Sequence, residues 1–171
     1  VAAPNKLLLT GFLFFLALQL LIFQNLNLGP YLAPMPYILF LMLFPCTYPA
    51  ALLMLWAFAF GLALDLLGTG IMGLHTSSLV LVGALRNILM KTVTVKGDLD
   101  NHMVPGFSQF GFARYSIFIS LCVMSHHLVF FALESLSLFL FWHTFARFLC
   151  SLLLNVFLIL LFKKTFFERG R

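Results

Sequence analysis

Five ionisable side chains lie in or beside long apolar runs: His126, His127, Glu134, His143 and Arg147. A charge or an imidazole at membrane depth costs a few kcal/mol, so each needs an opposite charge, a water-filled cavity or a function. Counted from the turn near Glu134, His126 and Arg147 lie at similar depths on consecutive antiparallel helices. We therefore predict a buried polar cluster in which Glu134 or Asp65 stabilises the charge of Arg147.

The same histidines permit other chemistry, because facing histidines in a helical bundle can ligate haem or a metal ion. Intramembrane histidines are more often hydrogen-bonded packing residues, and we expect no cofactor and no metal. The sequence lacks the GxSxG, HExxH and Walker A motifs, so we expect no enzymatic activity. The three cysteines form no CxxC pair, and we expect no disulfide among Cys46, Cys122 and Cys150.

Asp65 is a further charge at the end of an apolar segment. Ala57, Gly61 and Asp65 share one helical face at a spacing of four residues. Small residues at this spacing let two membrane helices approach closely, so we predict tight packing of this helix on a neighbour. Asp65 itself either meets water or caps the turn at Gly68, or it has a specific binding role.

The composition of the chain predicts the kind of secondary structure that positions these residues. Of the 171 residues, 63% are apolar and 9% are charged, and the mean hydropathy is +1.08. A soluble domain of this size has too little interior for so much apolar surface. The apolar runs are continuous rather than alternating, which argues against a membrane β-barrel. We predict an all-α integral membrane protein, a single domain over residues 1–171, embedded in the lipid bilayer.

Six apolar segments approach the length of about 20 residues that a helix needs to cross a bilayer. They are residues 7–23, 31–44, 50–66, 71–90, 115–133 and 138–162. The second segment is short and carries Pro34 and Pro36 in its first turns, where proline is tolerated best. The one long polar stretch, residues 91–114, is expected to be a cytoplasmic loop.

The basic residues predict the orientation of these six spans. With the N-terminus inside, the outer loops receive no lysine or arginine, and the C-terminus is also inside. The cytoplasmic side receives Lys6, Arg86, Lys91, Lys96, Arg114, Lys163, Lys164, Arg169 and Arg171. We expect Arg86 to reach lipid head groups at the inner surface and Asn155 to form a hydrogen bond between helices. The net charge of +5 is explained by this topology, and we expect no nucleic-acid partner.

Residues 32–86 contain a specific order of motifs. A proline-bearing second helix and a short turn precede a third helix that ends in a G-x-x-x-D motif, here Gly61 to Asp65. A glycine-containing turn and a polar position open the fourth helix, here Gly68, Gly70, Gly73 and His75. In this order the stretch resembles the rod shape-determining protein MreD family. The motif positions Gly61, Asp65, Gly68, Gly73 and His75 are then either a tight, capped helical hairpin or a direct contact with a partner.

The resemblance implies a bacterial inner-membrane scaffold of the cell-elongation machinery. Members of the family bind MreC, a bitopic membrane protein, and so support regulation of the peptidoglycan synthase pair, RodA and its class B penicillin-binding protein, above the MreB filament. Their fold is similar to the substrate-binding subunit of energy-coupling-factor transporters. The alternative is therefore a vitamin-type binding subunit of a transporter, although this chain lacks the A-x-x-x-A run of such subunits. Asp65, His75, His126 and Arg147 would then line a pocket toward the outer side.

Overall fold

The computed structural model describes residues 3–95, 103–135 and 141–167, and all regular secondary structure in them is helical. The α-helices are α1 (Ala3–Leu21), α2 (Leu39–Met42), α3 (Ala50–Leu64), α4 (Leu74–Val93), α5 (Phe107–Ser135) and α6 (Phe141–Phe162). Short 3₁₀ turns cover Phe23–Asn25 and Pro36–Ile38, and π-helical turns cover Asp65–Thr69 and Lys163–Phe167. The predicted all-α fold class is confirmed for these residues.

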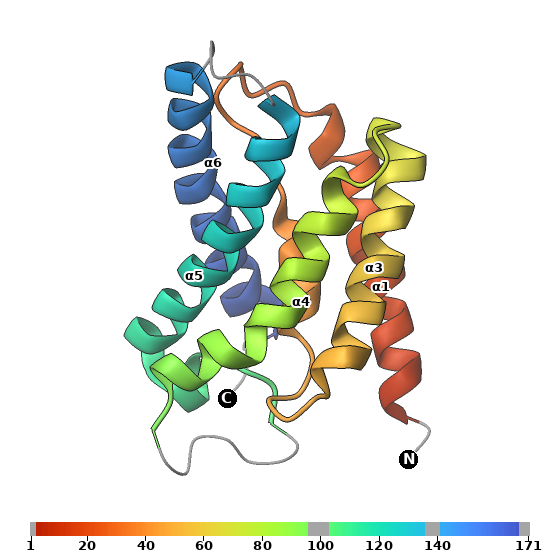
Figure 1. Ribbon diagram of the computed structural model, residues 1–171. Coiled ribbons are helices and arrows are strands. Elements are labelled where there is room, and N and C mark those ends of the chain that lie inside the picture. The colour runs from red at the N-terminus through yellow and green to blue at the C-terminus, as the bar shows by residue number, and fades with distance from the viewer. Residues whose placement is uncertain (1–2, 96–102, 136–140, 168–171) are drawn as a thin grey trace.

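The helices form one bundle in which neighbours along the chain pack side by side (Figure 1). α3 packs against α4, α4 against α5, and α5 against α6. In this view α1 starts at the bottom of the bundle, and α4 and α6 finish there. The turn between α3 and α4 lies at the top. The bundle therefore has two distinct ends, which we call the lower and the upper end.

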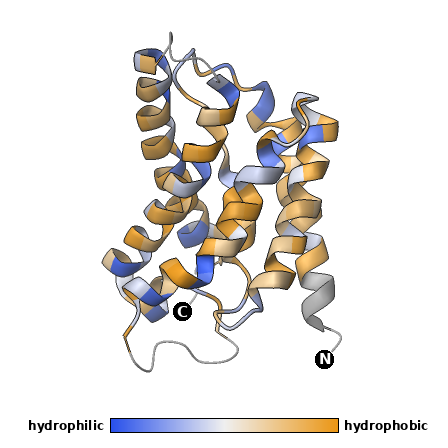
Figure 2. Ribbon diagram, in the orientation of Figure 1, coloured by the Kyte–Doolittle hydropathy of each residue, from blue (hydrophilic) through white to orange (hydrophobic). Residues whose placement is uncertain are grey.

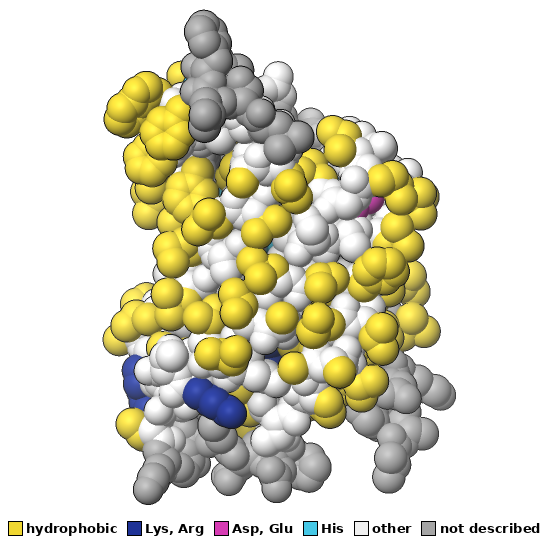
Figure 3. All heavy atoms as spheres, in the orientation of Figure 1, with side chains coloured by type: hydrophobic (Ala, Val, Ile, Leu, Met, Phe, Trp, Pro, Cys, Tyr) yellow, Lys and Arg dark blue, Asp and Glu magenta, His cyan; other side chains and the backbone are white. Residues whose placement is uncertain are grey.

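Four helical segments are long and apolar enough to cross a membrane: Leu8–Asn25, Ala50–Thr69, Phe107–Ser135 and Phe141–Phe167. α4 has a similar length but a more polar sequence, and it lies in the middle of the bundle. Apolar residues run along the helices (Figure 2), and hydrophobic side chains are spread over the whole height of the visible face, with Lys and Arg at its lower end (Figure 3). These features are consistent with a multi-pass membrane protein.

The second predicted span differs from the structure, because residues 31–44 do not form one helix. Residues up to Met35 are largely non-helical, and only the turn Pro36–Ile38 and the four-residue α2 follow. Proline lacks a backbone N–H and disfavours a helical conformation in the residue before it, so Pro34 and Pro36 prevent a regular first turn. The segment from Met35 to Met42 is nevertheless almost completely buried. It forms the centre of the bundle rather than a lipid-facing helix.

The predicted loop 91–114 was too long. α4 continues to Val93, and helical structure resumes at Phe107, interrupted at Gly111. Gly111 has a φ of +73°, a conformation that favours glycine, and there the chain changes direction before the long part of α5. Residues 96–102 of this loop and residues 138–140 of the predicted sixth span lie outside the described residues.

Candidate functional site

Asp65 is completely buried at the end of α3, where its carboxylate caps the start of α4. The oxygen Oδ1 accepts hydrogen bonds from the backbone N–H of His75 (2.8 Å) and from its Nδ1 (2.9 Å). The oxygen Oδ2 accepts from the backbone N–H of Gly73 (2.9 Å) and Thr76 (3.2 Å) and from the Thr76 hydroxyl (2.6 Å). The three backbone N–H groups and the Thr76 hydroxyl favour the ionised carboxylate, to which His75 Nδ1 then donates, and this carboxylate also complements the positive end of the α4 dipole.

This cap explains the residues around it. Gly73 occupies the N-cap position of α4 with a φ of +92°, and it has no side chain with which to cap the helix itself. Asp65, eight residues earlier, supplies the missing acceptor to the second and third residues of α4, His75 and Thr76. Asp65 thus caps α4 rather than the turn at Gly68.

Gly61 permits this arrangement because it brings α3 against the first turn of α4. A Cβ atom at Gly61 would lie 2.5 Å from the Thr76 Cα and 2.8 Å from the Thr76 nitrogen. Gly68 faces the end of α1 and the 3₁₀ turn after it instead, where a Cβ would lie 3.2 Å from Leu20 Cδ2 and 2.9 Å from the side-chain oxygen of Gln24. The motif residues Gly61, Asp65, Gly73 and His75 therefore meet in one tightly packed hairpin, and Gly68 joins that hairpin to α1.

His126 and His127 belong to a second, fully buried hydrogen-bonded chain. Asn155 Nδ2 lies 3.0 Å from His127 Nε2, the Nδ1 atoms of the two histidines lie 3.3 Å apart, and His126 Nε2 lies 3.1 Å from the Tyr37 hydroxyl. Asn155 Oδ1 accepts from the Met35 N–H, so its nitrogen must be the donor to His127. Two neutral imidazoles then donate in one direction, from His127 to His126 and on to Tyr37.

The same Asn155 holds the non-helical segment before α2. It accepts from the Met35 N–H and donates to the carbonyl of Ala33 (2.7 Å). One turn earlier on α6, the Ser151 hydroxyl accepts from the Ala33 N–H (3.0 Å) and donates to the carbonyl of Tyr31 (3.1 Å). Backbone groups buried in a membrane protein must find internal partners, and these two side chains supply them. The predicted interhelical hydrogen bond of Asn155 is thus present, to His127 of α5, and the same side chain also holds irregular backbone.

Arg147 and Glu134 form an ion pair at the upper end, with Nη1 and Oε2 2.7 Å apart and both side chains about one-third exposed. Of the two predicted carboxylate partners, the structure selects Glu134, because Asp65 is occupied at α4. The Arg147 guanidinium also lies over the Phe131 ring, 5.4 Å from its centroid. His143 stands apart from the pair and packs its ring against Tyr31, with centroids 5.2 Å apart. The five predicted residues therefore divide into an exposed pair, a buried histidine chain and a separate His143.

Arg86 is buried rather than extended toward lipid head groups, which corrects the sequence prediction. Its guanidinium donates to the carbonyls of Phe44 and Pro45 and to the Asn87 side chain. Pro45 lacks an N–H and helical pairing stops after α2, so Arg86 supplies a donor to the Phe44 carbonyl and a second donor to the Pro45 carbonyl, which also accepts from the Tyr48 N–H at 3.1 Å. Arg86 thus holds the chain directly after α2. Asn155 and Ser151 hold the non-helical chain before α2.

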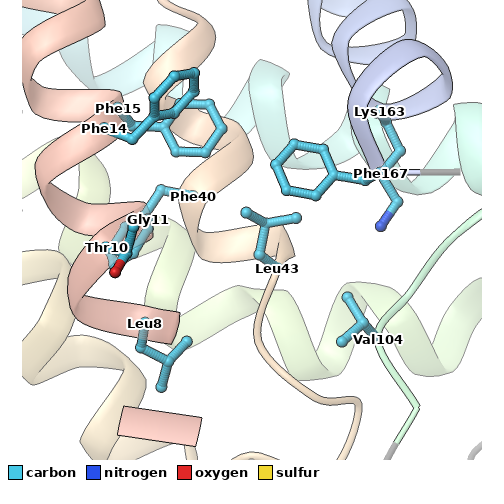
Figure 4. A pocket seen from close by; sticks show the side chains of 10 residues that line it. All are labelled: Leu8, Thr10, Gly11, Phe14, Phe15, Phe40, Leu43, Val104, Lys163 and Phe167. Atoms are coloured by element: carbon cyan, nitrogen blue, oxygen red, sulfur yellow. The ribbon is translucent and has the colours of Figure 1, made fainter. Parts of the chain in front are cut away.

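Two hollows differ in chemistry. The lower groove, about 400 Å³, lies between α1 and the C-terminal π-helical turn, and Lys163 is the one charged residue among its described lining residues (Figure 4). Its remaining walls are mostly apolar, including Leu8, Phe14, Phe40 and Phe167, and they suit hydrocarbon. The upper pocket, about 240 Å³, has polar walls from α1, α4, α5 and α6, among them Gln19, His75, Glu134 and Arg147. Of these two hollows, the upper pocket offers several groups for recognising a polar ligand.

Of the residues predicted to line an outer pocket, His75 and Arg147 do so, whereas Asp65 lies behind His75 and His126 lies in the buried chain. Gln19 was missed, because one glutamine within a long apolar helix carries no pattern. Within residues 3–95, 103–135 and 141–167, no three His, Cys, Asp or Glu side chains are grouped so that they could hold a metal ion. No family model, curated protein or solved structure matches this chain.

Proposed function

We propose that this protein is a non-enzymatic membrane scaffold of the bacterial cell-elongation machinery, as its resemblance to the MreD family implies. In this proposal it binds an MreC-like bitopic protein in the inner membrane and, through it, supports regulation of the RodA and class B penicillin-binding protein pair near MreB. The observation that carries the proposal is the hairpin of α3 and α4. Its motif residues Gly61, Asp65 and His75 bind one another and Thr76, which supports a rigid structural role rather than turnover of a substrate.

We further propose six spans with both ends in the cytoplasm. α1, residues 31–44, α3, α4, α5 and α6 follow one another between the two ends of the bundle (Figure 1), although residues 31–44 cross without a continuous helix. Arg86, Lys91, Arg114, Lys163 and Lys164 lie in or beside the lower end, which supports a cytoplasmic position for that end. Lys96, Arg169 and Arg171 lie outside the described residues.

Affinity purification from native membranes in mild detergent, with mass spectrometry of the associated proteins, tests the scaffold proposal. We expect an MreC-like protein together with a RodA and penicillin-binding protein pair. Parallel purification of a Gly61→Leu variant, in which α3 and α4 cannot approach, is expected to lose these partners, while a Gly11→Leu variant in the open lower groove serves as the control. Absence of these partners from the unaltered protein would contradict the proposal.

A second candidate is the vitamin-type binding subunit of a membrane transporter. The observation in its favour is the upper pocket, with a polar lining at one end of the bundle. In the same purification, an associated ATPase module together with a bound vitamin would select this candidate over the scaffold.

A further inference from the structure

Gln19 lines the upper pocket and carries a buried acceptor that has no partner in the described part of the chain. Its side chain is only 7% exposed, and its Nε2 donates to the carbonyl of Pro34 at 3.2 Å, which fixes the amide orientation. The oxygen Oε1 is buried and has no hydrogen-bond partner among the described residues. A buried acceptor without a donor is costly, so the inner wall of the pocket favours a ligand that brings one.

His75 adds a second acceptor to the same pocket. Because its Nδ1 donates to the Asp65 carboxylate at 2.9 Å, the neutral ring has its lone pair on Nε2. That nitrogen forms no hydrogen bond within the described part of the chain. Phe130 packs edge-on against the His75 ring, with centroids 5.1 Å apart, and both Phe130 and Phe23 line the pocket. Two acceptors beside aromatic rings form a favourable environment for an ammonium group, which has three donors and binds aromatic faces.

The Glu134 and Arg147 pair gives the partly exposed part of the pocket both signs of charge. The two side chains are joined by a single contact of 2.7 Å and are 29% and 30% exposed, so each retains atoms open to a ligand. The Arg147 guanidinium is suited to a phosphate, and the Glu134 carboxylate is suited to a cation. A zwitterion with a phosphate on the outside and an ammonium inside matches this order of charges.

We propose that the upper pocket binds a phosphoethanolamine group, with its ammonium donating to Gln19 Oε1 and His75 Nε2 and its phosphate on Arg147. The volume of about 240 Å³ equals that of about eight liquid water molecules at roughly 30 Å³ each, which accommodates such a group. The position at the end of a bundle of apolar helices is where the head group of a membrane lipid lies. The chemistry is shared by an aminophospholipid and by free phosphoethanolamine. Choline, by contrast, has no N–H donors for the two acceptors.

Native mass spectrometry of the purified full chain in detergent tests this site with three probes: phosphatidylethanolamine, phosphatidylcholine with the same acyl chains, and free phosphoethanolamine. We expect retention of phosphatidylethanolamine over phosphatidylcholine by about tenfold, the effect of one lost charge-assisted hydrogen bond. Displacement of the lipid by free phosphoethanolamine would assign the site to a soluble zwitterion. Resistance to that competition would assign it to a lipid head group. Equal retention of the two lipids would overturn the proposal.

Variants then locate the binding. We expect Gln19→Leu to abolish the preference for phosphatidylethanolamine, and Gln109→Leu to preserve it. Gln109 is the matched control, because its Oε1 is also buried without a partner among the described residues but lies on α5 away from the upper pocket. If Gln19→Leu does not fold, Arg147→Gln replaces a partly exposed side chain and is expected to weaken both lipid and free phosphoethanolamine binding. An unchanged preference in a folded Gln19→Leu variant, or unchanged binding of phosphatidylethanolamine and free phosphoethanolamine in the Arg147→Gln variant, would place the binding elsewhere and refute the site.

Discussion

Gly61 on α3 and Thr76 on α4 lie so close together that a Cβ at Gly61 would come within 2.5 Å of the Thr76 Cα. Because backbone atoms are on both sides of this contact, neither helix can yield by a side-chain rotation. The contact places the Asp65 carboxylate, one turn after Gly61, directly at the N–H groups of His75 and Thr76. Close approach and capping are therefore two parts of one arrangement, which accounts for the four-residue spacing of the glycine and the aspartate.

Gly61→Ala should destabilise the protein by about 1–3 kcal/mol, the range for inserting a methyl group into a fully packed site. Gly11→Ala is the matched control, since a Cβ at Gly11 meets only the Phe40 ring at 3.8 Å, an ordinary contact. Thermal denaturation in detergent, followed by size-exclusion chromatography of the surviving fraction, measures both variants. Equal melting temperatures for the two variants would show that the α3 and α4 contact is looser than described.

Asp65→Ala removes the acceptor of five hydrogen bonds and leaves buried donors at the start of α4 unpaired. We expect a loss of about 3–5 kcal/mol, comparable to breaking a buried ion pair. Glu134→Gln removes a carboxylate from a partly exposed pair, and its effect on stability should stay within about 1 kcal/mol. The same thermal assay compares them, and a larger effect at Glu134 than at Asp65 would contradict this ranking.

The sequence predicted the helical class, the position of most helices and the proximity of Gly61 to a neighbouring helix, because these depend on local apolar runs and spacing. It did not predict that residues 31–35 avoid a helix. That outcome depends on Ser151 and Asn155, about 120 residues later, which supply hydrogen bonds that local sequence does not reveal.

The candidate site was predictable only in part, for a similar reason. Depth along two adjacent helices predicted that His126 meets Arg147, but His126 contacts Tyr37 and His127 instead. The choice of Glu134 over Asp65 as the partner of Arg147 required knowing that α4 occupies Asp65. Gln19 belongs to α1, and its role depends on the Pro34 carbonyl and on the empty volume beside it. Neither the hydrogen bond to Pro34 nor the neighbouring pocket can be predicted from the spacing of residues along one helix.

Ser151→Ala and Asn155→Leu should release different backbone amides of the irregular segment. Ser151 accepts from the Ala33 N–H and Asn155 from the Met35 N–H, so the first substitution should increase hydrogen exchange at Ala33 and the second at Met35. Hydrogen–deuterium exchange with fragmentation resolves the two amides. Leu153→Ala, on the exposed side of α6, is the control and should leave both unchanged. Uniform exchange in the two variants would mean that the segment is held by other contacts.

Arg86→Lys should destabilise the protein although it conserves the charge. A lysine has a single ammonium on a flexible stem and cannot reproduce the planar set of donors that reaches Phe44, Pro45 and Asn87 at once. We expect a loss of about 1–3 kcal/mol in the thermal assay, the cost of an unpaired buried carbonyl. Lys91→Arg, at an exposed position one turn later on α4, should have no measurable effect. A stable Arg86→Lys variant would indicate that water satisfies these carbonyls.

Photo-crosslinking maps the partner predicted by the scaffold proposal onto a helix face. α6 presents an exposed apolar stripe at intervals of three and four residues, formed by Trp142, Phe145, Leu149, Leu153, Phe157 and Leu161. The span that contains α6 is only 17% buried, so α6 offers a free apolar surface on which a single helix of a bitopic protein can pack. A photoreactive residue at Leu153, which is 73% exposed, should yield an adduct with that protein, whereas one at the fully buried Leu39 should yield none. Adducts at the exposed Leu55 of α3 but not at Leu153 would move the interface to the other side of the bundle.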